Sequence, residues 1–439
     1  MTASPEPRTH LPPRLLPVLY FTTAHVALAF AFAAVALDPR GVSGFFYHAR
    51  MLGIVHLVTL GWITASILGS LYVVGPIALR MWIPAMWLDY TAFGLVLVGI
   101  VGMVAHFWLQ QYSGMAWSAI TVGAGIMAVG VHVAACLRDA SLPRAISAHI
   151  MLAFLNVLGA ATLGVLIGFD KVHHFLPGFV LANVFAHAHL AALGWATMMV
   201  VGIAYRLLPM ILPAAMPGGP RLWISAVLLQ AGVSGLFATL LLRSPLAWMF
   251  ALTVVAGLAA FAVQVVWMLR RPRPRPPGLR RPDPAVMHAG ASFASLGIAS
   301  MLGVWLTIAE PSSATLRIAM AYGVFGLVGF LAQMVVGMEG RLLPIFAWYW
   351  AHANSGYKGP VPSQHEMPWR HGQEVVFVSW LFGVPALAGG LAFDAIPFVR
   401  AGAWCLFAGA LLDAVNVARI LRHVFVAPRA ARRPIFTTP

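Results

Sequence analysis

Two stretches of the sequence decide the fold: residues 56–76 read HLVTLGWITASILGSLYVVGP and residues 189–209 read HLAALGWATMMVVGIAYRLLP. Shifted by 133 positions, they share histidine, glycine, tryptophan, tyrosine and proline at matching places without a gap. A third copy at residues 324–344 keeps Gly329, Gly337 and Pro344, but has Val324 in place of the histidine. Self-similarity at a fixed period indicates a chain built from repeated units.

The copies lie within continuous apolar segments of about 20 residues, long enough to cross a hydrocarbon core of roughly 30 Å. Of the 439 residues 61% are hydrophobic and 9% charged, which excludes a soluble enzyme. The lack of alternation along the apolar runs excludes a β-barrel. We predict an all-α membrane protein with twelve transmembrane helices in three quasi-equivalent groups of four. The predicted segments are 15–37, 50–78, 85–108, 115–137, 145–168, 180–208, 221–242, 246–269, 286–308, 316–345, 374–395 and 401–423.

The positive charges set the predicted orientation. If both termini are cytoplasmic, 21 of the 27 Lys and Arg residues lie in cytoplasmic segments and 6 in outer segments. This predicts a multi-pass protein of the cell inner (cytoplasmic) membrane. The net charge of +15 is then explained by contact with anionic lipid, with no nucleic acid as partner. Residues 270–285 are predicted to form a cytoplasmic Arg/Pro-rich linker.

A second repeated phrase divides the chain further. Ala24-His25 and Ala148-His149 are each followed by the same Leu-Ala-Phe, and Met287-His288 resembles a third copy. We therefore interpret residues 1–439 as a single polytopic membrane domain with internal repeats at about 15–137, 145–269 and 286–423. Parallel repeats with an even number of helices predict a quasi-threefold axis along the membrane normal.

The histidines are the candidate metal ligands. His56 and His189 lie at matching depth on related helices, and two neutral imidazoles at one level can form an axial pair for a haem. His187 points about 200° away from His189 on an ideal helix and can serve a second site. The alternative is that these imidazoles are hydrogen-bonded polar groups that hold helices together. The candidate metal ligands are His56, His187, His189, His25 and His149.

The residues around the two histidines allow two interpretations. Gly61, Gly194, Trp62 and Trp195 could leave a groove for a flat macrocycle, or they could serve close helix packing. No C-x-x-C-H motif occurs, so the predicted cofactor is non-covalent haem b, with copper as a further candidate. Among the few acidic groups, Glu339 is expected to pair with Arg341 or Arg206, or to relay protons.

The twelve helices in three groups of four, the histidine on the second helix and the H-x-H helix together resemble subunit I of the haem–copper oxidase and nitric oxide reductase superfamily. The resemblance implies that His56 is a haem ligand. In that family an H-x-H on helix ten also holds haem, and histidines on helices six and seven hold the partner metal. Here the H-x-H stands on helix six, helix ten offers Tyr322, Met334 and Met338, and helix seven has no histidine. A complete binuclear centre is therefore not expected.

Three functional hypotheses follow. The leading one is a haem-binding membrane redox protein in electron transfer or in nitric oxide or oxygen handling, an oxidoreductase of the haem–copper type. The resemblance implies a cytochrome c-type or quinol electron donor and the lipid bilayer as surroundings. The alternatives are a transporter or permease with a histidine-lined path, and an assembly subunit whose histidines have lost their role.

Overall fold

The computed structural model describes residues 11–275, 282–357 and 361–426. Within them, twelve helical spans are long and apolar enough to cross a membrane, which confirms the predicted all-α, twelve-span fold. The spans are α1 (Leu15–Leu37), α3–η1–α4 (Ala49–Ile77), α5 (Trp87–Leu109), α6 (Tyr112–Arg138), α7 (Arg144–His173), α8–η2–α9 (Val180–Ile211), α10 (Arg221–Leu241), α11 (Ala247–Leu269), α12 (Pro284–Ile308), α13–η3–α14 (Ser313–Asn354), α15 (Arg370–Ala392) and α16 (Ile396–Phe425).

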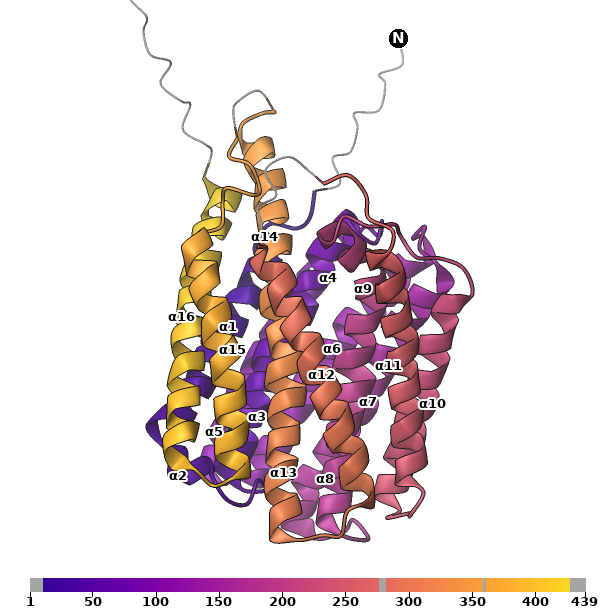
Figure 1. The fold of residues 1–439 in the computed structure, drawn as a ribbon, viewed down its shortest axis with the longest axis vertical. Coiled ribbons are helices and arrows are strands. Elements are labelled where there is room, and N and C mark those ends of the chain that lie inside the picture. The colour runs from indigo at the N-terminus through magenta and orange to yellow at the C-terminus, as the bar shows by residue number, and fades with distance from the viewer. Residues whose placement is uncertain (1–10, 276–281, 358–360, 427–439) are drawn as a thin grey trace, which may run out of the picture.

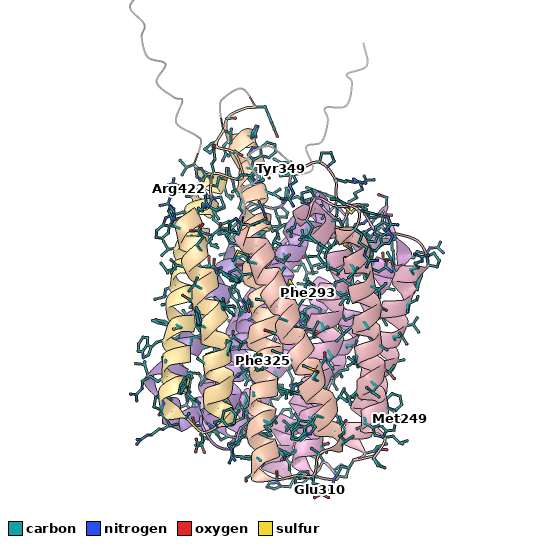
Figure 2. The ribbon with its side chains drawn as sticks, viewed as in Figure 1. Met249, Phe293, Glu310, Phe325, Tyr349 and Arg422 are labelled. Atoms are coloured by element: carbon teal, nitrogen blue, oxygen red, sulfur yellow. The ribbon has the colours of Figure 1, made fainter. Side chains whose placement is uncertain are left out.

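The bundle has two ends, which are named here by what they carry. At one end α1 begins and α16 ends, and we call it the terminal face (Figure 1). The opposite end, the far face, carries the short helix α2 (Pro39–Val42) and the start of α13. Figure 2 places Arg422 and Tyr349 toward the terminal face and Glu310 at the far face. The tenth span extends past the predicted end at residue 345 to Asn354, beyond the neighbouring helix ends.

Three spans form the centre of the bundle, and each contains a π-helical segment at the same place. The π-helical segments are in contact with one another around the bundle centre. π-Helical turns are rare, so three of them at equivalent positions are a structural mark of the repeat. The three spans divide into α3 (Ala49–His56), η1 (Leu57–Thr64) and α4 (Ala65–Ile77); α8 (Val180–His189), η2 (Leu190–Thr197) and α9 (Met198–Ile211); and α13 (Ser313–Gly323), η3 (Val324–Ala332) and α14 (Gln333–Asn354).

The nine other spans of the described residues surround these three. In each group the first helix packs along the central one, as α1 does on η1 and α4, and the last two form a hairpin: α5–α6, α10–α11 and α15–α16. The groups join where α6 contacts α7, α11 contacts α12 and α16 contacts α1, so that the ring closes. This arrangement places the central helices, with their histidines, away from lipid.

Two tryptophan side chains tie the central helices together in a cyclic order. Trp62 of η1 donates from Nε1 to the carbonyl oxygen of Ala332 in η3, at 3.2 Å. Trp195 of η2 donates to Oγ1 of Thr64 in η1, at 3.0 Å. The equivalent position in the third copy is Phe330, which has no N–H to donate, so the third link of the cycle lacks this hydrogen bond.

We expect Trp195→Phe to lower the free energy of unfolding by about 1–3 kcal/mol, because it removes a buried hydrogen bond and part of a core side chain. Chemical unfolding in mixed micelles measures this change. Trp223→Phe is the matched control, because Trp223 is 41% exposed and should change stability by less than about 0.5 kcal/mol. Equal effects of the two substitutions would show that the link between η2 and η1 does not stabilise the bundle.

The predicted linker is only partly described. Its first residues run beside the loop between α9 and α10, where Arg273 donates its backbone N–H to the carbonyl oxygen of Pro213 at 2.8 Å. Residues 276–281 lie outside the described residues. Helix α12 begins at Pro284, so the predicted linker ends two residues earlier than its expected boundary at 285.

Candidate functional site

The far-face halves of the central helices are less buried than their terminal-face halves. Only Gly53 and Ile54 of α3 and only Met320 and Ala321 of α13 are fully buried. On the other side of the π-helical segment, almost every residue of α4 is buried. The candidate imidazoles of His56, His187 and His189 lie in these far-face halves, and all three are partly buried.

The structure brings His56 of α3 beside His187 of α8. Their ring centres are 6.4 Å apart and their planes differ by 26°. Nδ1 of His56 bonds to the carbonyl oxygen of Leu52 at 2.7 Å, and Nδ1 of His187 bonds to that of Ala160 at 2.8 Å. Because a carbonyl oxygen only accepts, each Nδ1 carries the proton and each Nε2 keeps a lone pair. Among the described residues, neither Nε2 has a hydrogen-bond partner.

His189 faces a different neighbour. Its Nδ1 bonds to the carbonyl oxygen of Phe185 at 2.8 Å, so its Nε2 accepts from the hydroxyl of Tyr322 at 3.1 Å. The two rings are nearly parallel, with centres 5.9 Å apart. The sequence pattern predicts that His56 pairs with His189, whereas the imidazole that lies beside His56 is that of His187, two residues earlier on the same helix.

The tryptophans and glycines next to the histidines serve helix packing. Trp62 and Trp195 are buried, and their ring N–H groups hold neighbouring central helices. A Cβ at Gly61 would lie 2.4 Å from Ala27 Cβ of α1, and one at Gly194 would lie 2.8 Å from the side chain of α7 that faces it. The space beside both glycines is thus filled by neighbouring helices.

His25 and His149 do not occupy equivalent places. The ring of His25 contacts Trp62 at 5.0 Å, and the residue that contacts Trp195 in the same way, at 5.2 Å, is Phe154. In the sequence, His25 aligns with His149, but in the structure the position equivalent to His25 is that of Phe154, about one helical turn further along α7. The two histidines lie at different depths, and only His25 is beside a tryptophan of a π-helical segment.

His149 has no free nitrogen. Its Nδ1 bonds to a backbone carbonyl oxygen at 2.7 Å and its Nε2 bonds to Oγ of Ser225 at 3.0 Å. It packs against Gly202, and His288 packs in the same way against Gly337. His149 and His288 are thus structurally equivalent, and the contacts of His149 are those of a satisfied core residue.

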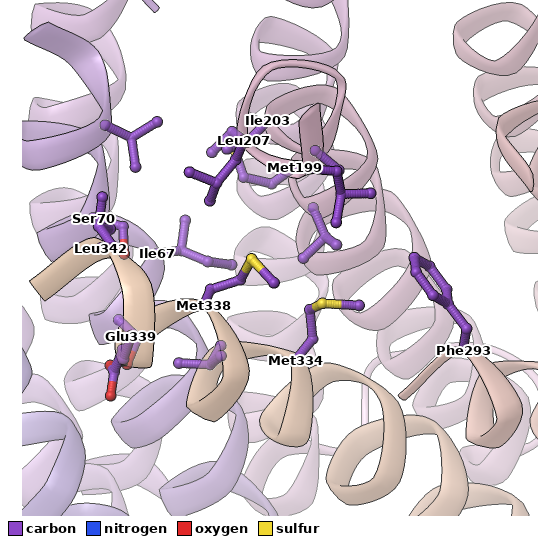
Figure 3. A pocket seen from close by; sticks show the side chains of 16 residues that line it. Ile67, Ser70, Met199, Ile203, Leu207, Phe293, Met334, Met338, Glu339 and Leu342 are labelled. Carbon is purple, nitrogen blue, oxygen red and sulfur yellow. Dashed lines mark hydrogen bonds between the residues drawn. The ribbon is translucent and has the colours of Figure 1, made fainter. Parts of the chain in front are cut away.

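A cavity of about 80 Å³ lies between the central helices on the terminal-face side of the π-helical segments. Equivalent positions of α4, α9 and α14 line it, as the trio Ser66, Met199 and Met334 illustrates. Figure 3 shows Met334 and Met338 reaching from α14 into this space, with Glu339 at its side. The lining is almost wholly apolar, which does not suit a hydrated cation path.

Glu339 belongs to a buried cluster on the terminal-face side of the bundle. Nε2 of His25 lies 3.5 Å from Oε2 of Glu339 and 3.6 Å from Oδ2 of Asp413 on α16. The expected pairing of Glu339 with Arg341 is wrong, because Arg341 forms an ion pair with Asp283 at the start of α12. Residues two apart on a helix point in nearly opposite directions, so Glu339 faces inward while Arg341 reaches the terminal face.

A second buried network was missed by sequence reasoning. Asp89 of α5 accepts from the hydroxyl of Tyr72 at 2.8 Å, from Nδ1 of His132 at 2.7 Å and from the backbone N–H of Met86 at 2.7 Å. Asp89 is 1% exposed. Asp89 stands in no recognisable sequence motif, and only the tertiary fold shows that it joins α4, α5 and α6.

The donor set of His56 and His187 fits a haem iron. Neutral imidazoles with a free lone pair at Nε2 are ligands of haem iron. Here two such donors lie next to each other, with ring centres 6.4 Å apart and planes 26° from parallel. Both rings are held by hydrogen bonds from Nδ1 to carbonyl oxygens, as metal-binding histidines commonly are.

No protein-family description and no curated protein sequence matches this chain. Among solved structures, the chain is similar to a chain of a haem–copper terminal oxidase dimer determined by cryo-EM, with a TM-score of 0.61 and 10% sequence identity. The match covers 95% of this chain and 86% of the other. The two proteins thus share a fold along nearly their whole length, at 10% sequence identity.

Proposed function

We propose that this chain is a haem-binding integral membrane redox protein, active in electron transfer or in nitric oxide or oxygen handling without a complete binuclear centre. The observation that supports it best is the pair of imidazoles on α3 and α8, with Nδ1 anchored and Nε2 unbonded on both. The fold shared with a haem–copper terminal oxidase chain adds support.

In this proposal His56 and His187 hold the iron of haem b. The bound haem supplies reversible one-electron chemistry. The backbone carbonyl oxygens of Leu52 and Ala160 keep each imidazole in the tautomer that offers a lone pair at Nε2, and they restrict ring rotation. Phe107 packs on His56 at 5.1 Å between ring centres and limits access of water from that side.

His189 and Tyr322 extend the proposed site on the adjoining face. The hydroxyl proton of Tyr322 is held at 3.1 Å from Nε2 of His189, so this pair can store a proton between two central helices. A second metal such as copper would have to displace this hydrogen bond to reach Nε2. The pair therefore supports the proposal that a complete binuclear centre is lacking.

The surroundings of the site define its proposed partners. We place the protein in the cell inner membrane with both termini cytoplasmic, so that the imidazole pair lies in the outer half of the bilayer. A donor on that side, of the cytochrome c or quinol type, would be within a short distance of the far-face half of α3 and α8. No nucleic acid partner is proposed.

A reduced-minus-oxidised optical spectrum of the purified protein tests the proposal. We expect a Soret band and the α and β bands of a six-coordinate haem b, with about one haem per chain. Protein purified from haem-replete cells without a Soret band would refute it. Uptake of a substrate by such haem-free protein in vesicles would then favour the transporter hypothesis.

A further inference from the structure

We propose that His25, Glu339 and Asp413 form a binding site for one divalent first-row transition-metal ion, for which zinc is the best match. The three residues come from α1, α14 and α16, three helices far apart in the sequence. The site is separate from the imidazole pair of the proposed haem site and does not depend on it.

The distances in the cluster match a coordination polyhedron better than hydrogen bonds. The two distances from Nε2 of His25 to carboxylate oxygens are 3.5 and 3.6 Å, and all three ligand atoms lie within 4.8 Å of one another. Full-strength hydrogen bonds between charged nitrogen and oxygen are about 2.7–2.9 Å long. Ligands about 2.1 Å from a tetrahedral zinc ion are separated by about 3.4 Å, close to the observed values.

The three converging atoms all offer lone pairs. Nδ1 of His25 donates to the carbonyl oxygen of Phe21 at 2.8 Å, which leaves a lone pair at Nε2. Among the described residues, Nε2 of His25, Oε2 of Glu339 and Oδ2 of Asp413 have no hydrogen-bond partner, and all three side chains are more than nine-tenths buried. Such a set is unfavourable without a cation, because buried charges have to be paired.

The charges identify the class of ion. Two carboxylates and one neutral imidazole neutralise a divalent cation, so the filled site carries no net charge within the membrane. Imidazole nitrogen excludes a preference for magnesium or calcium, and the absence of thiolate ligands in the cluster disfavours copper(I). Zinc, manganese(II) and iron(II) accept this mixed nitrogen and oxygen set, and zinc favours four-coordination with three protein ligands.

The neighbouring groups support the ligands. Ser66 donates to Oε1 of Glu339 at 3.3 Å, so the other carboxylate oxygen stays available. The ring of Trp62 meets that of His25 edge to face at 5.0 Å and restricts its rotation. Glu339 also borders the cavity of about 80 Å³ between the central helices, and Asp413 borders a second, smaller pocket. A water molecule in either space could complete the coordination.

Among the described residues this cluster occurs once, although the fold repeats three times. The position of His25 in the first unit is taken by Phe154 in the second. The shift of 135 positions between the second and third copies places Ala204 opposite Glu339. One site, and hence one ion per chain, is therefore expected.

Metal analysis of the holoprotein tests this proposal. After incubation with zinc and dialysis, we expect about one zinc ion per chain, measured by inductively coupled plasma mass spectrometry. Glu339→Gln and Asp413→Asn should each lower the zinc content at least tenfold while the Soret band and the elution profile stay unchanged. His149→Gln is the matched control, because this equally buried histidine is bonded to Ser225, borders neither the cavity nor the smaller pocket and should leave the zinc content unchanged.

The wild-type protein alone can overturn the proposal, even if the variants fail to fold. Less than 0.1 zinc, manganese or non-haem iron per chain after metal loading would refute the site. If an infrared band of a protonated carboxylic acid, lost in Glu339→Gln or Asp413→Asn, accompanied that result, protons rather than a metal would neutralise the cluster. Full zinc binding by both variants would also refute it.

Discussion

His56→Ala and His187→Ala are each expected to lower the haem content of the purified protein at least tenfold and to abolish the six-coordinate spectrum. Each substitution removes one of the two neighbouring imidazoles whose Nε2 has no hydrogen-bond partner among the described residues. An iron left with one protein ligand is bound far more weakly, and its Soret band shifts. The haem content per chain and the reduced-minus-oxidised spectrum measure the effect.

His189→Ala and His149→Ala are the controls. They distinguish the histidine pair observed in the structure from the pair that the sequence pattern predicts. Both are expected to retain the haem spectrum, because Tyr322 holds Nε2 of His189 and Ser225 holds that of His149. The sequence pattern alone paired His56 with His189 and predicts the opposite result for His189→Ala. Loss of haem in His189→Ala but not in His187→Ala would therefore refute the proposed pair, and addition of free imidazole should partly rescue the His56 and His187 variants.

Asp89→Ala is expected to lower the free energy of unfolding by about 3–5 kcal/mol, the largest effect we expect of a residue outside the proposed site. The substitution removes a buried carboxylate and leaves three donors, on Tyr72, His132 and Met86, without an acceptor. Each unsatisfied buried donor costs about 1–3 kcal/mol. Chemical unfolding in mixed micelles provides the measurement.

Asp38→Ala is the matched control for this prediction. Asp38 forms an ion pair with Arg50 at the far face, where both side chains are about half exposed. Exposed ion pairs contribute roughly 0–1 kcal/mol. Asp38 also accepts from the backbone N–H of Gly41 at the start of α2, and such a cap contributes about 0.5–2 kcal/mol. The control should therefore cost clearly less than Asp89→Ala. A loss of under 1 kcal/mol in Asp89→Ala would show that the Tyr72–Asp89–His132 network rearranges or takes up water without cost.

The number and place of the spans could be predicted because each depends on a long, locally readable apolar run. The first span was predicted at 15–37 and is Leu15–Leu37; the eighth was predicted at 246–269 and is Ala247–Leu269. The tenth span was predicted too short, since its end at Asn354 is stabilised by contacts beyond the apolar run. There the side chains of Arg14 and Asn354 are hydrogen-bonded, and Trp350 donates to the carbonyl oxygen of Pro12.

The partners of the polar residues could not be predicted, because they depend on the relative rotation and depth of helices. The three π-helical segments change that rotation, and a single sequence carries no clear signal for them. His56 therefore lies beside His187 instead of His189. The sequence match between His25 and His149 is also misleading, because the residues that align in sequence differ by about one helical turn from those that are equivalent in the structure. The same uncertainty concealed the cluster of His25, Glu339 and Asp413.

The π-helical segments have a consequence for how this architecture can diversify. Two of them, η1 and η2, lie directly after the stretches that bear the imidazoles, η3 follows the stretch that bears Tyr322, and all three are wound more loosely than the α-helix on either side. Gain or loss of one residue there would swing the histidine-bearing half about the helix axis and leave the tightly packed half untouched. Insertions or deletions of single residues in these three π-helical segments could therefore produce new ligand geometries while the rest of the helix bundle stays unchanged.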